Sequence, residues 1–597
     1  MPTSTIPPGS ATAAEAPPWF RNALRALAVA MGALHTAVAV LQQSMNEDGI
    51  SYLDLGDAYW RGDFDAIVNG TWSPAYAWIV ASTVRLVEPP IAWEFPVVQL
   101  ANLGVYVVAL VCFEFFWRRL TLRYYAHGDG AGPWQAADGG AGQATRFPPA
   151  VWLALGYSLF IWSSLDLVNL WAVTPDMGVA AVVYLVAGFL LGASACAASA
   201  RRMFPFGLLL GFGYLVKAAL LPLGIVAAAF AAFVMTGPVH RRVAAFGAAL
   251  AGIAVVGGPL IVALSWSSGQ LTIGDIGRFT YLKHVNEMPY ADYHGALDRL
   301  AGRPVNPPRL VHEDPRVFEF AEPVGGTYPM AYDPGYWTRG LEPTVTVSGQ
   351  LRALATSATA YFDLFVRRQG GFVALVLLLF WMRRREEQRP EPSGETAILL
   401  WALAAFGMYA LVHVLPRYVA PFVVLFWAGA LARLAFPAGA MGARLATLGG
   451  VLLTVFVWIN LAALHLDGVS SVTGFTPLAE ASTERGTEAV AEPRPDHVAI
   501  AADLERRGLH EGERIGFIGY SYNQYWARLA RLRIVAEIHL HETQQFWTAT
   551  PERQAEVLAA FARAGAVAVV SAPVPQQARP PGWQSLGDSQ YLIYGLR

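Results

Sequence analysis

Runs of apolar residues long enough to cross a lipid bilayer recur along most of this chain. A spanning helix needs about 20 predominantly apolar residues, and such runs are spread over residues 19–466. Only 14% of the 597 residues are charged, against roughly 25% in a soluble protein. The sequence therefore predicts a polytopic α-helical membrane protein with about eleven transmembrane helices, at residues 23–43, 95–117, 147–165, 175–197, 203–217, 219–236, 243–265, 369–382, 396–414, 417–436 and 445–465.

Arginines mark one side of the predicted membrane domain. If the N-terminus is cytoplasmic, every even-numbered span ends in the cytoplasm, and those ends are rich in arginine. The short loops on the other side contain almost none. This positive-inside distribution predicts a multi-pass protein of the cytoplasmic (inner) membrane with a cytoplasmic N-terminus. The arginines are Arg118, Arg119, Arg123, Arg201, Arg202, Arg241, Arg242, Arg383, Arg384, Arg385, Arg433 and Arg444.

The segments outside the spans divide the rest of the chain. Two long loops are predicted to face outward, and a Pro/Ala-rich N-terminus is predicted to be disordered. A polar linker then leads to a C-terminal domain. In order, these segments are residues 1–18 (N-terminus), 44–94 and 266–350 (outer loops), 467–496 (linker) and 497–597 (C-terminal domain).

The C-terminal segment reads as a small extracytoplasmic α/β domain. Helical and strand patterns alternate from His497 onward, which predicts a mostly parallel sheet. Gly519-Tyr520-Ser521 lacks the second glycine of a hydrolase nucleophile elbow. We expect a structural or recognition module rather than a second enzyme.

Charge and cysteine content exclude some classes of function. A net charge of −2 gives no reason to expect a nucleic-acid partner. Cys112 and Cys196 are the only cysteines, and both lie in apolar segments, so the soluble parts hold no disulfide. An alanine- and arginine-rich composition suggests a bacterial protein.

Two adjacent carboxylates follow the first span. Glu47 and Asp48 precede a loop that is rich in aromatic and acidic residues. A carboxylate is costly to hold at the mouth of a membrane helix, so one found there usually binds a cation, moves a proton or activates a nucleophile. Farther along the loop, four more acids are expected to be solvated charges: Asp54, Asp57, Asp63 and Asp65.

Two cations break the arginine rule. Lys217 and Arg417 lie at the predicted outward ends of spans, where the cytoplasmic bias does not explain them. Arginine grips a phosphate with two parallel hydrogen bonds and lysine acts as a point charge. We therefore expect phosphate binding, with snorkelling to lipid headgroups as the alternative.

The order of these motifs resembles the C-type (GT-C) glycosyltransferases. This superfamily includes protein mannosyltransferases, the aminoarabinose transferase of lipid A, and oligosaccharyltransferases. The resemblance covers about residues 1–465, and the C-terminal segment has no counterpart in it. The motifs are the acidic pair followed by Tyr52 and Leu53, Trp72-Ser73-Pro74-Ala75-Tyr76, Thr174-Pro175-Asp176, Gly213-Tyr214-Leu215-Val216-Lys217, and Pro416-Arg417-Tyr418.

The resemblance implies a transfer reaction at the outer face of the membrane. A sugar would pass from a polyprenyl-phosphate-linked donor to a lipid, glycan or protein acceptor of the cell envelope, with a first-loop carboxylate as base. A sugar hydroxyl is a poor nucleophile, so a carboxylate must accept its proton. Asp48 is the preferred base because it begins the Asp-Gly-Ile-Ser-Tyr run, and Glu47 is the alternative.

Further residues are candidates for the acceptor or for a divalent metal ion. Asp166 and Asp176 flank the second outer turn and are assigned to an acceptor or metal site. His284 and Glu287, spaced i and i+3, could share a metal if both are helical, but with no clear third ligand an amphipathic helix lying on the membrane is the favoured interpretation. The proposed pocket lining comprises Tyr76, His284, Glu287, His294, Tyr336 and Trp337.

Two other classes of function remain as alternatives. A secondary transporter also carries membrane-embedded charges, but typically shows internal repeats and charges near the bilayer midplane. A non-catalytic scaffold or sensor would use the C-terminal domain for recognition and would not need the acidic pair.

Overall fold

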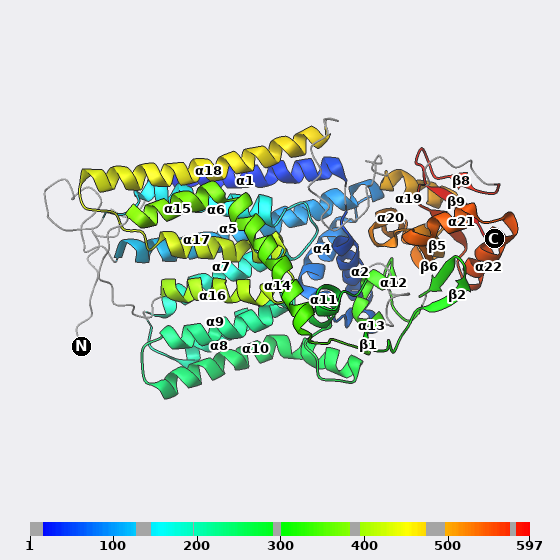
Figure 1. Cartoon of the computed structure of the whole chain (residues 1–597), viewed down its shortest axis with the longest axis horizontal. Coiled ribbons are helices and arrows are strands. Elements are labelled where there is room, and N and C mark those ends of the chain that lie inside the picture. Colours follow the sequence, from blue (N-terminus) through cyan, green and yellow to red (C-terminus); the bar gives the residue numbers. More distant parts are fainter. Residues whose placement is uncertain are drawn as a thin grey trace.

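The computed structural model describes most of the chain as a long helix bundle with a sheet-containing domain at one end (Figure 1). The described residues are 16–43, 45–126, 145–194, 196–289, 300–320, 322–382, 394–472, 496–573 and 581–597. Most of the predicted disordered N-terminus (1–18) and of the predicted linker (467–496) therefore lies outside them, as does His294.

Each predicted membrane-spanning run coincides with a helix of the bundle. Among the residues that the structure describes, six helices are long and apolar enough to cross a membrane. A bent pair, α14 with its π-helical end and α15, makes a seventh candidate with a 73° break. Helices α9, α16 and α17 are apolar but shorter, so the number of spans stays a prediction. The bundle comprises α1 (Pro18–Gln42), α5 (Glu94–Ala126), α6 (Pro149–Trp162) with η4 (Ser163–Leu167), α7 (Asp176–Ala193), α8 (Ala200–Val216), α9 (Leu220–Val234), α10 (Val239–Ser268), α14 (Val347–Phe362) with η6 (Asp363–Arg367), α15 (Gly370–Met382), α16 (Gly394–Ala410), α17 (Pro416–Leu431) and α18 (Ala440–Val472).

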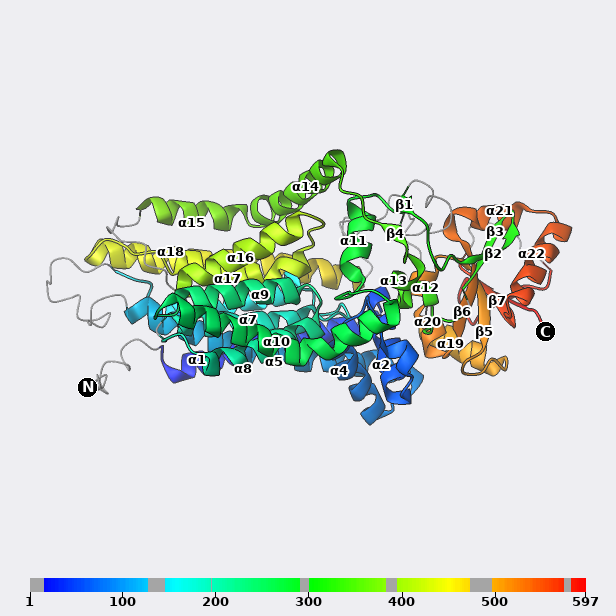
Figure 2. The ribbon, with the colours of Figure 1, turned by 90° about the horizontal axis from the view of Figure 1, so that it is seen from below.

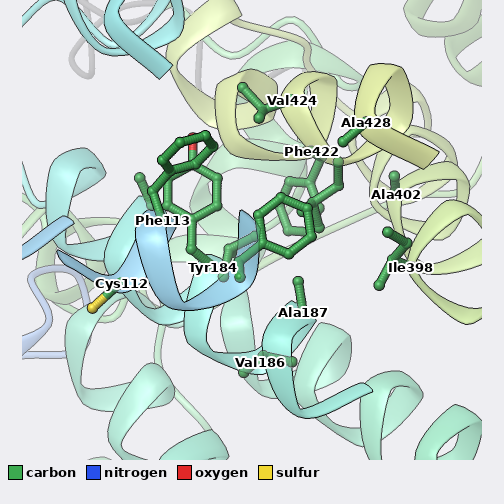
Figure 3. Packing of buried hydrophobic residues seen from close by; sticks show 14 of the residues in the cluster. Cys112, Phe113, Tyr184, Val186, Ala187, Ile398, Ala402, Phe422, Val424 and Ala428 are labelled. Atoms are coloured by element: carbon green, nitrogen blue, oxygen red, sulfur yellow. The ribbon is translucent and has the colours of Figure 1, made fainter. Parts of the chain in front are cut away.

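The bundle core combines aromatic rings with small residues. Phe113 of α5 meets Tyr184 of α7 edge to face, with ring centroids 5.4 Å apart. Figure 3 shows these rings beside Phe422 of α17, with Ala187 and Ala402 on the neighbouring helices. Small residues let membrane helices approach closely, and the rings fill the remaining space. This packing fixes how the outer helix ends are placed relative to one another.

The approach of α8 to α10 depends on glycine. A Cβ added at Gly207 would lie 2.1 Å from the carbonyl oxygen of Ala249, and one at Gly252 would lie 2.4 Å from that of Phe204. Such distances are far below any real contact, so a side chain at either position would push the helices apart. Close packing of this kind orients the C-terminal end of α8, where Lys217 follows.

The predicted outer loops lie at the same end of the bundle as the C-terminal domain (Figures 1 and 2). The 44–94 segment is mostly helical rather than an open loop, because its apolar residues recur on one face and pack against the bundle. These outer elements are α2 (Glu47–Arg61), α3 (Phe64–Ile67), α4 (Pro74–Val87), η2 (Ile91–Trp93), α11 (Ile276–His284), β1 (Ala301–Gly302), α12 (Pro329–Tyr332), α13 (Pro334–Trp337) and β4 (Leu341–Glu342).

The sheet of the C-terminal domain is mixed, and part of it comes from the second outer loop. Its seven strands have the order β2-β3-β6-β5-β7-β9-β8. Only the central β6-β5-β7 strands are parallel, and the flanking pairs are antiparallel, so the prediction of a mostly parallel sheet is wrong for the sheet as a whole. The outer strands join as hairpins and through the second outer loop, which the strand–helix alternation of the C-terminal segment does not reveal. The elements are β2 (Arg309–Glu313), β3 (Arg316–Glu319), α19 (His497–Arg506), β5 (Arg514–Gly519), η7 (Ser521–Asn523), α20 (Tyr525–Leu529), β6 (Arg533–His539), η8 (Leu540–Glu542), α21 (Thr543–Thr548), α22 (Pro551–Arg563), β7 (Ala568–Ser571), β8 (Gln584–Ser585) and β9 (Leu592–Gly595).

A buried arginine joins this domain to the outer helices. Arg528 of α20 is 3% exposed, and it pairs with Asp54 (2.9 Å) and with Asp57 of α2. Its Nε also lies 3.5 Å from Glu94, the first residue of α5. Burial would lower the pKa of Arg528, but the three carboxylates outweigh burial and hold that pKa well above its ordinary value.

The prediction that Asp54 and Asp57 are solvated loop charges is therefore wrong. Asp54 also accepts hydrogen bonds from the backbone N–H (2.6 Å) and the hydroxyl (3.0 Å) of Thr327. Both acids face the C-terminal domain, which the local sequence gives no means of anticipating. Asp63 and Asp65 are exposed, as expected.

Candidate active site

Four of the charged residues proposed from the sequence form one cluster. Arg417 donates from its NH2 group to Asp48 Oδ2 (3.1 Å), and its Nε lies 3.7 Å from Asp176 Oδ2. Lys217 donates to the other oxygen of Asp176 (2.5 Å). Asp176 thus lies between the two cations, and Asp48 is held by one of them.

Each member of the cluster comes from the end of a different helix. Asp48 lies in the first turn of α2, and Asp176 begins α7 directly after Pro175. Lys217 follows α8 in extended conformation, before α9 begins. Arg417 is the second residue of α17, after Pro416, whose missing N–H costs nothing in the first helical turn. These helix ends lie at the end of the bundle next to the C-terminal domain, and their charged side chains meet there.

The cluster pairs two carboxylates with two cations in a partly shielded site. Asp176 is almost fully buried, whereas Asp48 and Arg417 each keep 27% of their side-chain surface exposed. The ammonium of Lys217 lies 3.9 Å from the centroid of the Tyr418 ring, which adds a cation–π contact. Partial exclusion of water strengthens each of these attractions several-fold relative to bulk solvent.

Two buried tyrosines back the cluster. Tyr52 of α2 and Tyr76 of α4 pack edge to face, with ring centroids 5.0 Å apart. The Tyr76 hydroxyl donates to Asn102 (2.6 Å). Burial, and then the charges of Asp48 and Asp176, raise the pKa of Tyr52 well above its usual value. The predicted pocket residue Tyr76 therefore lies behind the acids as a neutral, hydrogen-bonded group.

Glu47 points to a different partner from Asp48. Its Oε1 accepts a hydrogen bond of 2.6 Å from the hydroxyl of Tyr520, in the C-terminal domain. A narrow crevice opens beside this contact, lined by Glu47, Ile50, Ser51, Asp54, Thr327, Tyr328, Ala331, Ser521, Tyr522 and Gln524. The two adjacent acids therefore have different partners: Glu47 contacts the C-terminal domain and Asp48 contacts Arg417 of the bundle.

Asp166 does not join the cluster. It lies in the π-helical turn η4, where Trp162 donates to its Oδ2 (2.9 Å) and Arg368 lies 3.8 Å from its Oδ1. Of the two acids assigned together from the sequence, the structure therefore brings only Asp176 to Asp48, Lys217 and Arg417.

His284 and Glu287 do not share one helical face. Helix α11 ends at His284, and Glu287 follows with φ of 56° and pairs with Arg352. The His284 ring stacks on His413 with centroids 3.8 Å apart; burial and His413 lower the pKa of His284 to about 3. Within the described residues, no group of three or more His, Cys, Asp or Glu side chains is arranged to hold a metal ion.

The two predicted aromatic pocket residues of the second loop pack inside it. The indole of Trp337 is buried and donates to the carbonyl of Pro329 (3.0 Å), while Tyr336 is half-buried against it. Neither residue lines the crevice beside Glu47. Tyr520 and Tyr418 were not proposed as site residues from the sequence, because only the folded chain brings them to the charged groups.

Comparison with known proteins supports the fold. No protein-family model and no curated protein matches the sequence. Among solved structures, the chain is similar to ArnT from Cupriavidus metallidurans, determined with bound undecaprenyl phosphate. The match has a TM-score of 0.51 at 14% identity and covers 95% of this chain and 97% of that one.

This similarity confirms the predicted fold class, a polytopic helical membrane protein with a C-terminal α/β domain, through a shared fold with ArnT. The uncovered 5% is too short to contain residues 497–597. The likeness therefore extends into the C-terminal domain, for which the sequence motifs indicated no counterpart.

Proposed function

We propose that this protein is a membrane glycosyltransferase that moves a sugar from a polyprenyl-phosphate-linked donor to an acceptor. The observation that carries the proposal is the convergence of Lys217 and Arg417, from separate helix ends, beside the carboxylate of Asp48. The undecaprenyl phosphate bound to the structurally similar ArnT supports a donor of this class. The arginine bias of the opposite helix ends supports a site at the outer face of the membrane.

The two cations would hold the donor phosphate. Arg417 presents a planar fork that matches two phosphate oxygens, and Lys217 adds a point charge. Asp176 ties both cations to one place, because each of them contacts one of its oxygens. Held in this way, the cations stabilise the negative charge that develops on the departing phosphate.

The reaction then needs one proton acceptor. The acceptor hydroxyl oxygen bonds to the anomeric carbon as the bond between that carbon and the phosphate oxygen breaks. The hydroxyl proton passes to Asp48, and the bonding electron pair leaves with the polyprenyl phosphate. A phosphate leaving group needs no proton near neutral pH, so one base and two cations are sufficient.

The contact between Arg417 and Asp48 suggests how donor binding prepares the base. A phosphate that takes up N–H groups of Arg417 competes directly with Asp48 for them. Asp48 is then released from part of this contact, and its carboxylate oxygen can accept a hydrogen bond from the acceptor hydroxyl instead. Asp48 would thus stay paired with Arg417 until the donor phosphate binds.

Replacement of Asp48 by Asn tests the proposal. We expect donor binding to persist while transfer falls roughly 10²–10⁴-fold, the usual contribution of general-base catalysis. Transfer of radiolabelled sugar from a polyprenyl-phosphate donor in proteoliposomes measures this, and Asp65→Asn, at an exposed position of α3, is the matched control. Near-normal turnover would move the role to Glu47, and full activity of the double variant would exclude the transferase.

A further inference from the structure

Tyr520 connects the C-terminal domain to the acidic pair. The residue follows strand β5, and its hydroxyl donates to Glu47 Oε1 over 2.6 Å. The two residues are 473 positions apart in the sequence. Asp48, next to Glu47, is held instead by Arg417 of the membrane domain. Each acid of the pair is thus held by a different part of the molecule.

The loop that carries Tyr520 is built to hold it in place. The amide of Gln524 donates to the Tyr520 carbonyl (2.7 Å), and the Tyr522 ring lies 5.3 Å from that of Tyr520. Gly519 has φ of 140°, and a Cβ there would lie 2.8 Å from Ala572. Only glycine fits both conditions, so the turn from β5 into Tyr520 has a single shape.

This loop occupies the edge of the sheet where α/β domains commonly bind ligands. Strand β5 lies between β6 and β7 and is parallel to both, so the loop leaves the carboxyl end of the parallel core. That end meets α2 at the narrow crevice beside Glu47.

The groups around the crevice are mostly uncharged hydrogen-bonding groups. Hydroxyl and amide groups come from Ser51, Thr327, Ser521 and Gln524. The titratable groups that face Glu47 are Asp48 and Asp54 on α2, Tyr328 on the second outer loop, and Tyr520 and Tyr522 on the C-terminal domain. Asp54 is already paired with Arg528. The hydroxyl groups of the lining are bonded within the protein: Ser51 donates to the Ala331 carbonyl, Thr327 to Asp54 and Ser521 to Glu537. The crevice is therefore a joint between α2, the second outer loop and the C-terminal domain, and Glu47 lies in it next to Asp48.

We infer that Tyr520 is a positioning residue that holds the Glu47 carboxylate toward the acceptor side of the site. This inference rests on the proposed function. Asp48 serves the bond-forming step beside the donor phosphate, and Glu47 orients the acceptor under control of the C-terminal domain. The domain then acts as part of the transfer site, because its docking sets the position of a carboxylate next to the base.

A spectroscopic titration tests the contact without any turnover. A 3-fluorotyrosine at position 520 of the full chain reports its surroundings through its ¹⁹F resonance, recorded in detergent from pH 7.5 to 3.5. We expect a titration step that disappears in Glu47→Gln. Absence of the step, or its persistence in that variant, would overturn the inference.

Kinetics of Tyr520→Phe test the role. Loss of a hydrogen bond to a charged group should raise the acceptor KM roughly 10-fold and leave the donor KM unchanged. A donated hydrogen bond favours the ionised carboxylate, so its loss should move the acid limb of the pH–rate profile to higher pH. Tyr594→Phe, on β9 at the far side of the sheet, should change neither.

A double variant separates positioning from folding. If Tyr520 acts through Glu47, adding Tyr520→Phe to Glu47→Gln should cost almost nothing further. Additive losses, or an unmoved acid limb in Tyr520→Phe, would overturn the inference. If the wild-type chain shows no transfer from polyprenyl-phosphate donors, the proposed function fails, and the ¹⁹F titration still decides whether Tyr520 controls Glu47.

Discussion

Asp176 is the residue through which the two cations of the site are coupled. Its carboxylate contacts Lys217 with one oxygen and Arg417 with the other. Two neighbouring cations repel each other. A buried carboxylate between them offsets this repulsion and lets both side chains stay near one site. The sequence motif Thr174-Pro175-Asp176 contains this acid, which begins α7 directly after Pro175. The structure shows it paired with both cations.

Substitution of Arg417 by Lys should impair donor binding although the charge is kept. A lysine cannot reproduce the fork of N–H groups that lies near both Asp48 and Asp176. We expect the affinity for a polyprenyl phosphate to fall roughly 10-fold, about the value of one charge-assisted hydrogen bond. Binding of a fluorescent polyprenyl phosphate measures the change.

The matched control for this substitution is Arg367→Lys. Arg367 is 73% exposed and pairs with Asp363 in the π-helical turn before α15. Its substitution should leave donor affinity unchanged. If both variants lost the same affinity for the polyprenyl phosphate, both arginines would act only by attracting anionic lipids in general.

Asp333 should make stability fall with rising pH. Burial, helped by the charge of Asp275, raises the pKa of Asp333 to about 7, although it caps α13 by accepting from the Tyr336 N–H. An acid whose pKa is raised on folding contributes stability fully below its unfolded pKa, near 4, and loses it as pH rises through about 7. Asp333→Asn keeps the cap and should remove this loss.

Thermal unfolding of the full chain in detergent at pH 5 and pH 8 measures the effect. The wild-type protein should lose about 2 kcal/mol relative to Asp333→Asn across this range, after allowance for partial solvent exposure. Parallel pH dependence of the two proteins would show that Asp333 is already ionised in the folded state at pH 5.

At the scale of elements, helix α2 holds the two halves of the molecule together. Its first turn supplies the acid pair, and its middle supplies Asp54 and Asp57 to Arg528. The hairpin of β2 and β3 adds a second connection, because β3 pairs with β6 of the C-terminal domain. The domain is therefore fixed to the outer helices by both charge and sheet pairing.

Substitution of Arg528 by Met should loosen this joint. Removal of one partner from a buried ionic network leaves carboxylates unpaired and costs about 3–5 kcal/mol. We expect faster backbone hydrogen exchange in α2 and α20, and a lower acceptor turnover. Arg85→Met is the control, since Arg85 lies in the last turn of α4 in an exposed pair with Glu88. Unchanged exchange in α2 would mean that the hairpin alone docks the domain.

At the scale of the whole molecule, the charges proposed for chemistry gather at one end of a long apolar bundle. That end carries α2, the second outer loop and the mixed sheet (Figure 1). The bundle core is closed by rings such as Phe113 and Tyr184. Under the proposed function, a lipid-linked donor would approach along the membrane and its phosphate would meet Lys217 and Arg417 at this end of the bundle.

The sequence alone determined the apolar helices of the bundle, the central strands of the C-terminal domain and the candidate charges, but not the helices and strands within the outer loops. A segment that crosses a bilayer must be apolar, and it must form a helix because lipid offers no partners for its backbone N–H and C=O groups. Hydropathy therefore predicts these helices, and every predicted run coincides with one. Lys217 and Arg417 could be singled out because each breaks a charge rule that holds elsewhere along the chain. Strands β5, β6 and β7 were readable from local alternation.

Only the tertiary structure decided which of these residues meet. Asp166 and Asp176 look equivalent in sequence, yet packing brings only Asp176 to the cations. Asp54 resembles a solvated loop acid until α20 places Arg528 against it. Tyr520 reaches Glu47 across 473 positions. Hydropathy and helix signals act over a few residues, whereas these contacts depend on how helix ends and a distant sheet are oriented by the packed core, and no local pattern encodes that orientation.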